Sequence, residues 1–204
     1  MPRLEKGQHT PLNVTPKATR RIFAGLGWEP HTEIGLLDKI GAMVGVKKVD
    51  HDLDLSCMLF GADKKPIGDV STLRGQLADS EGHIYHSGDS VAGDGDGDDE
   101  QVSVELLKLD NAIEYILFVA SIKSGHTFGE IDSPEIRLTD GYSNHNFLQA
   151  QLNQIEGKAK SAFAFASIYR DSDGGWKLHN ISTYIDRSAV QKPNGILASL
   201  LEKN

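Results

Sequence analysis

The chain reads Gly88-Asp-Ser-Val-Ala-Gly-Asp-Gly-Asp-Gly-Asp-Asp-Glu100 and continues without a break into Gln101-Val-Ser-Val-Glu-Leu106. Asp94, Asp96 and Asp98 match the first three ligand positions of an EF-hand, and Glu105 falls at the twelfth. The sixth position is Asp99, where an EF-hand needs glycine for its sharp turn. The residues after the loop alternate between apolar and polar, as a strand does. The stretch therefore predicts an acidic loop between β-strands, not a helix–loop–helix unit.

This loop concentrates negative charge and glycine. Five like charges in water repel one another by about 6 kcal/mol in total before screening, and physiological salt removes about half of that or more. Alternating glycines allow backbone carbonyls to turn inward, so a cation can close the loop. Flexible, oxygen-rich loops suit Ca²⁺ better than Mg²⁺, and the loop has no Cys or His for zinc. A solvated acidic linker is the alternative interpretation. The five carboxylates belong to Asp94, Asp96, Asp98, Asp99 and Glu100.

A second pair of acids opens the segment Asp52-Leu-Asp-Leu-Ser-Cys-Met-Leu-Phe60. In a strand the alternation places Asp52 and Asp54 on one face, with Leu53 and Leu55 on the other. Two carboxylates on one face either share a counter-ion or face solvent at the edge of a sheet. The segment alone does not decide between these two arrangements. His83 and His86 are three residues apart and would point to opposite faces of a strand, so they are expected to be ordinary surface or edge histidines.

The rest of the chain repeats one pattern of short apolar runs between turn residues. About nine or ten strands with few helices predict an all-β fold, a β-sandwich of two mainly antiparallel sheets. We expect a single domain over residues 1–204, a helical insertion near 34–46 within the segment 30–50, and a short C-terminal helix near 195–201. The segment 171–175 is a strong hairpin turn. The expected strands cover 11–15, 20–28, 52–60, 67–70, 102–109, 114–122, 135–139, 147–152, 161–170 and 176–185.

Composition narrows the function classes. The formal net charge is −8 with no basic block, so non-specific nucleic-acid binding is disfavoured. Cys57 is the single cysteine, so no intrachain disulfide is possible. No signal peptide and no apolar run long enough for a transmembrane segment are evident, so the expected location is the cytoplasm. No phosphate-binding P-loop, nucleophile elbow or Cys-x-x-Cys motif is present.

Several segments, taken in order, resemble the TerD-domain proteins of tellurite resistance and general stress. The chain departs from the family pattern in the long segment between Glu29 and Asp52, in Ser90 where the family usually has Asn, and in residues 180–183, which lack a glycine-rich motif. The matching stretches are Lys6-Gly7-Gln8, Gly25-Leu-Gly-Trp-Glu29, Asp52-Leu-Asp-Leu-Ser-Cys57, His86-Ser-Gly-Asp-Ser90, the acidic run 93–100, Phe128-Gly129, Ile136-Arg-Leu138, Tyr169-Arg170 and Trp176-Lys177.

The resemblance implies a calcium-binding β-sandwich of a stress-response system, and it joins the strand acids to the loop in one site for one or two Ca²⁺ ions. It implies partner proteins of the same stress and tellurium-resistance system, in complexes associated with the inner face of the membrane. It does not imply an enzyme. The implied ligand pool is Asp52, Asp54, Asp89, Asp94, Asp96, Asp98, Asp99 and Glu100.

Two further hypotheses stay open at this point. One is a metal-dependent enzyme, or a binder of a nucleotide or phosphate in which the cation acts as a bridge; a related eukaryotic branch of the family is linked to cyclic AMP. Such an enzyme needs a base, and His51 and His86 are the nearby candidates. The other is a calcium-dependent phospholipid-binding module without a membrane span.

Overall fold

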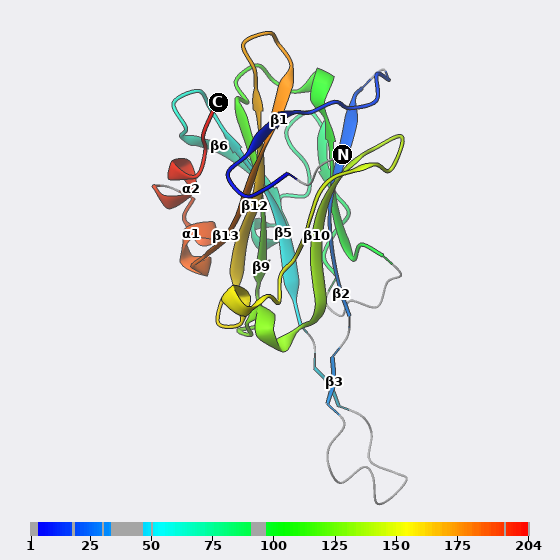
Figure 1. The fold of residues 1–204 in the computed structure, drawn as a ribbon, viewed down its shortest axis with the longest axis vertical. Coiled ribbons are helices and arrows are strands. Elements are labelled where there is room, and N and C mark those ends of the chain that lie inside the picture. The colour runs from blue at the N-terminus through cyan, green and yellow to red at the C-terminus, as the bar shows by residue number, and fades with distance from the viewer. Residues whose placement is uncertain are drawn as a thin grey trace, which may run out of the picture.

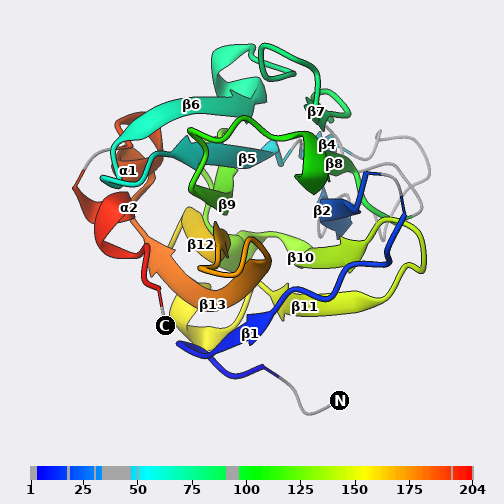
Figure 2. The same ribbon diagram turned by 90° about the horizontal axis from the view of Figure 1, so that it is seen from above.

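The computed structural model describes residues 4–17, 19–29, 31–33, 47–49, 51–90, 97–193 and 195–203, with 31–33 and 47–49 described by their backbone alone. Two sheets pack face to face (Figures 1 and 2). All strand pairs in the described residues are antiparallel. The expected β-sandwich is therefore confirmed.

Among the described residues, the first sheet has six strands. In spatial order they are β1 (His9–Pro11), β13 (Trp176–Ile185), β12 (Ala162–Arg170), β9 (Tyr115–Ile122), β5 (Leu53–Phe60) and β6 (Pro66–Ser71). The second sheet has five strands in the part of the chain that the structure describes: β11 (Asn146–Gln151), β10 (Asp132–Asp140), β2 (Arg21–Glu29), β8 (Glu100–Glu105) and β7 (Ile84–His86).

Shorter elements connect or cover the sheets. The pair β3 (His31–Glu33) and β4 (Lys47–Val49) forms a separate two-stranded ribbon that extends from one end of the sandwich (Figure 1). Two helices, α1 (Arg187–Gln191) and α2 (Ile196–Ser199), lie on the side of the six-stranded sheet away from its partner (Figure 2). The 3₁₀ turns are η1 (Thr72–Arg74), η2 (Leu106–Lys108), η3 (Phe128–Glu130) and η4 (Ile155–Gly157).

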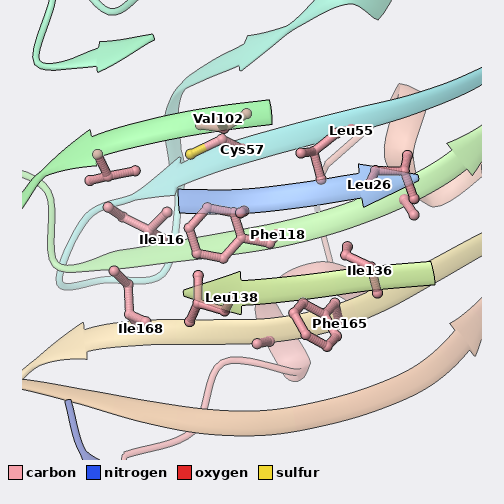
Figure 3. Packing of buried hydrophobic residues seen from close by; sticks show 14 of the residues in the cluster. Leu26, Leu55, Cys57, Val102, Ile116, Phe118, Ile136, Leu138, Phe165 and Ile168 are labelled. Atoms are coloured by element: carbon pink, nitrogen blue, oxygen red, sulfur yellow. The ribbon is translucent and has the colours of Figure 1, made fainter. Parts of the chain in front are cut away.

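The main core lies between the two sheets, where Leu26, Leu55, Phe118, Ile136 and Phe165 interdigitate (Figure 3). The central strand β9 is buried along its whole length, because its other face is covered as well. That outer face forms a second apolar cluster with residues of α1 and α2. Burial of β9 on both faces explains why residues 115–120 are continuously apolar and do not alternate.

Several predicted elements need correction. The first edge strand lies at His9–Pro11 and not at 11–15; it ends where the Leu12 N–H donates to the Trp176 carbonyl. The strand expected over 102–109 ends at Glu105 and turns into η2. Helix α1 was not predicted, because it is only one turn long. The helical insertion at 34–46 lies outside the described residues, and the single-domain assignment stays a prediction.

Candidate metal centre

Three of the predicted acids come together at one end of the six-stranded sheet. Asp52 directly precedes β5, Asp54 lies within it, and Asp89 lies in the loop after β7. Each offers one carboxylate oxygen, and these oxygens all lie within 4.8 Å of one another. The alternation of β5 explains the pair: Leu53 and Leu55 point into the main core, so the two aspartates share the opposite face.

Asp54 is fully buried. The alternative in which this carboxylate faces solvent at a sheet edge is therefore wrong. Its Oδ1 accepts a hydrogen bond from Thr72 Oγ1 at 2.5 Å, and burial raises the pKa of this carboxyl group. Among the described residues, Asp54 Oδ2 and Asp52 Oδ1 have no hydrogen-bond partner. Ser121 stands directly opposite Asp54 in the ladder, and its buried Oγ also lacks one. The site thus collects three buried oxygens whose bonding capacity is unmet.

Lys123 supplies the positive charge at this cluster. It follows β9, and its backbone N–H donates to the Asp52 carbonyl. Its Nζ lies 3.1 Å from Asp52 Oδ2 and 3.5 Å from Asp89 Oδ2. The hydrogen bond to Asp52 raises the pKa of the lysine, and the nearby charges of all three aspartates add to this effect. The ammonium group is therefore the counter-ion of the cluster in this structure.

A buried pair, His86 and Glu100, connects the two sheets beside the acids. Glu100 Oε2 accepts from the Leu55 N–H at 2.7 Å, and His86 Nε2 lies 3.0 Å from the Leu55 carbonyl. Strand β6 pairs with β5 only from Ser56 onward, so it does not reach Leu55. The Glu100 and His86 side chains bind the Leu55 N–H and carbonyl in its place. Burial raises the pKa of Glu100, whereas the hydrogen bond from His86 acts in the opposite direction.

The same pair positions Asp89. The Gly88 N–H donates to His86 Nδ1 at 3.0 Å, and the Ser90 N–H donates to Glu100 Oε1 at 3.3 Å. Because Nδ1 accepts a hydrogen bond, the His86 proton is on Nε2 and the ring is neutral. Two anchored N–H groups thus flank Asp89 and direct it toward β5. The Ser90 contact uses only backbone, so the exchange of Asn for Ser at this position leaves it intact.

The last acids of the loop make other bonds. Arg137 binds the Asp98 carboxylate at two points, 2.8 Å and 3.0 Å. Asp99 Oδ2 accepts from the Trp28 N–H at 2.9 Å. The loop lies flat against β2 here: a Cβ on Gly25 would lie 2.1 Å from an Asp98 oxygen, and a Cβ on Gly27 would lie 2.6 Å from the Gly97 carbonyl. The Gly-Leu-Gly-Trp motif thus packs against residues 97–99.

Of the predicted ligand pool, the structure brings together Asp52, Asp54 and Asp89. Asp98, Asp99 and Glu100 bind protein groups instead, and Asp94 and Asp96 lie outside the described residues. Sequence reasoning missed Thr72, Ser121 and Lys123. Ser121 and Lys123 could have been identified from the sequence, because they are polar residues at the end of its most apolar run. His86, expected at a surface or edge, is fully buried.

A family model of the TerD domain matches residues 1–189. The chain belongs to the TerD-domain family. The tellurium resistance protein TerZ of Serratia marcescens is 34% identical over 173 residues, which cover 85% of this chain and 84% of that protein. The tellurium resistance protein TerD of an Alcaligenes species is 27% identical over 183 residues, covering 87% and 88%.

Other relatives of this TerD-domain chain include the stress response protein SCP2 of Bacillus subtilis, 29% identical over 182 residues, covering 85% of this chain and 87% of that protein. A crystal structure of a homologue of telluride resistance protein (TerD) from Streptomyces coelicolor superposes with a TM-score of 0.65 at 22% identity, over 81% of this chain and 90% of that one. This likeness shows the shared fold. Within the described part of the TerD-domain chain, no helix has the length and apolar character needed to cross a membrane.

Proposed function

We propose that this TerD-domain protein is a non-enzymatic calcium-binding module of a stress-response system, and that Asp52, Asp54 and Asp89 hold the ion. The observation that supports this most is the convergence of three carboxylates, two of which, Asp52 and Asp54, have a buried oxygen with no hydrogen-bond partner among the described residues. Hard oxygen donors without nitrogen or sulfur are the ligands that Ca²⁺ prefers.

The charge of the cluster suits a divalent ion. Three carboxylates and the single ammonium of Lys123 leave a formal charge of −2 when all are ionised. Ca²⁺ takes about 6–8 oxygen ligands. The three aspartates, the Ser121 hydroxyl and water supply part of that number. Asp94 and Asp96 remain candidates for the rest.

A bound ion would replace Lys123 as the counter-ion, and the lysine side chain can move because it is 41% exposed. The ion would also tie the loop after β7 to the start of β5, two segments that the buried His86–Glu100 pair already places side by side. We propose that the tied loop presents a surface to other proteins of the same stress and tellurium-resistance system. This fits the names of the relatives, several of which are stress or tellurium-resistance proteins.

Calorimetric titration of the protein with Ca²⁺ tests the proposal. The expected result is binding with a dissociation constant of about 10 µM or tighter, as in sensor sites, and loss of that binding in Asp54→Asn. The matched control is Asp63→Asn, because Asp63 lies in an exposed turn and pairs with Lys65. Absence of heat in the wild type, or equal binding in Asp54→Asn, would contradict the proposal.

A further inference from the structure

A second group of metal-ligand side chains lies away from the acidic cluster. His9 comes from β1, His179 from β13, and Glu202 from the segment after α2. Each offers one ligand atom, and the three atoms lie within 4.8 Å of one another. His9 and His179 are direct partners in the antiparallel ladder, so the strand pairing itself holds the two side chains next to each other.

The fold brings Glu202 to the histidines. Leu178 points into the main core, so the adjacent His179 faces the outer side of the sheet. Leu201 is fully buried in the apolar cluster on that same side, and it anchors the C-terminal segment there. Glu202 follows directly. This residue lies beyond the part of the chain that the family model matches.

Tyr169 orients one of the two rings. It is 1% exposed, and its hydroxyl lies 3.0 Å from His9 Nδ1. When Nδ1–H donates to this oxygen, the His9 Nε2 lone pair is available for a metal. Histidine ligands in metal sites commonly have their second nitrogen bound in this way.

His179 is the unexplained member of the group. It is 5% exposed, yet its Nδ1 has no hydrogen-bond partner among the described residues. Ser167 stands opposite it on β12, and its buried Oγ also lacks a partner in the described part of the chain. Two unmet polar atoms in one row are costly in a folded protein unless a ligand or water serves them.

Burial lowers the pKa of both rings. Burial lowers the pKa of His179 to about 4, and the nearby His9 adds to this. Burial also lowers the pKa of His9, against the opposite effect of Glu202. Neutral imidazole is the form that coordinates metals. The nearby lysines are paired: Lys177 lies 3.3 Å from Asp171, and Lys203 forms an ion pair with Glu114.

We propose that His9, His179 and Glu202 form a site for a zinc-class divalent transition metal. Two imidazoles and one carboxylate are a ligand set that zinc accepts, with water in the fourth position, whereas Ca²⁺ prefers oxygen alone. The two rings are stacked at 4.1 Å and almost parallel, 5° apart. Binding requires them to tilt so that both lone pairs converge, and the partly exposed His9 has room to do so.

Titration of the full chain with ZnCl₂, followed by calorimetry, tests this site. The expected result is one zinc ion per chain and a loss of at least about tenfold in affinity in His9→Gln and in Glu202→Gln. Both positions are at the surface or partly exposed, so the fold should survive. His83→Gln is the control histidine and Asp54→Asn the control for the acidic cluster; both should bind zinc as the wild type does. Unchanged affinity in His9→Gln and Glu202→Gln, or loss of zinc in Asp54→Asn, would overturn the proposal.

Nitrogen NMR of the wild-type imidazoles gives an independent reading that needs no variant. Zinc should shift the ring nitrogens of His9 and His179 and change the angle-dependent ring-current shifts between them, whereas Ca²⁺ should leave them unchanged. Zinc-induced shifts confined to other histidines would also overturn the assignment.

Discussion

At the scale of single residues, Lys123 and a bound metal ion would compete for the same carboxylate oxygens. Lys123 Nζ lies 3.1 Å from Asp52 and 3.5 Å from Asp89, so it occupies the place of a cation. A lysine is a point charge on a flexible stem, and it can leave when a divalent ion offers more charge to the same oxygens. The lysine therefore stabilises the metal-free protein and weakens the affinity for Ca²⁺.

Lys123→Met should strengthen Ca²⁺ binding by about tenfold, because one unit charge near the ion no longer opposes it. It should also lower the stability of the metal-free protein, because three carboxylates lose their counter-ion. Calorimetry and denaturant unfolding in EDTA measure the two effects. Lys65→Met makes the same charge change in an exposed turn and should alter neither. Equal affinity in both variants would show that Lys123 does not compete.

Asp54 makes the metal-free protein sensitive to pH. Its folded pKa is raised by burial, so the native state binds this proton more tightly than the unfolded chain does. The free energy of unfolding must therefore fall as the pH rises from the ordinary value, 3.8, through the folded pKa. Glu100, whose pKa is also raised, acts in the same direction.

Asp54→Asn should raise the free energy of unfolding in EDTA at pH 7 by about 1 kcal/mol, because it removes a buried ionised group. Below the ordinary pKa the variant and the wild type should become equal, since both are then neutral at this position. Urea unfolding at pH 3.5 and at pH 7 provides the comparison. A variant less stable than the wild type at pH 7 would contradict the raised pKa.

At the scale of elements, strands β10, β2 and β8 together hold Asp98 at the end of the acidic loop. Arg137, Gly25 and Gln101 are neighbours in one row across β10, β2 and β8. Asp98 lies over the glycine and is bound by Arg137 on one side and by Gln101, at 3.4 Å, on the other. Glycine at this position leaves room for the carboxylate. Strand β2 therefore sets the position of Gly97 and Asp98, the described end of the loop.

Gly25→Ala should destabilise the protein by about 1–3 kcal/mol, because the new methyl group overlaps the Asp98 carboxylate and must displace it. Gly68→Ala is the matched control in strand β6, where the nearest atom, Leu59 Cδ1, lies 3.7 Å from the new Cβ. It should change the stability by less than about 0.5 kcal/mol. Urea unfolding measures both. Equal stability of the two variants would contradict the proposed role of Gly25.

The sequence predicted these elements to different degrees. Strands with clear alternation or strong turns, such as β5 and the β12–β13 hairpin, were identified because their signals are local. The common face of Asp52 and Asp54 followed from the same alternation. Other features depend on which strands pair and in what register. These are the burial of Asp54, the position of Lys123 and the hydrogen bond of Glu100 to Leu55. Such non-local pairing has no short-range signature, so the composition of the site could not be predicted in full.

At the scale of the whole molecule, the sheet that carries both proposed metal sites is covered on two sides. The second sheet covers its inner face, and α1 with α2 covers part of its outer face. Leu197 of α2 and the following Leu201 are fully buried there. The C-terminal segment thus completes the fold and also brings Glu202 to the histidine pair.

Leu197→Ala should lower the free energy of unfolding by about 2–3 kcal/mol, through lost burial and the cavity that remains. The neighbouring Ile196 is 55% exposed, so Ile196→Ala should cost less than about 0.5 kcal/mol. Denaturant unfolding compares the pair. If Leu197→Ala proved as stable as Ile196→Ala, the C-terminal helices would not be part of the cooperative fold.

An anomalous-difference map from crystals grown with calcium would show whether the three aspartates hold the ion. We expect a peak about 2.3–2.6 Å from carboxylate oxygens of Asp52, Asp54 and Asp89, with the Lys123 ammonium moved away from them. A map without a peak at these oxygens, with Lys123 still paired to Asp52, would show that these aspartates do not bind calcium.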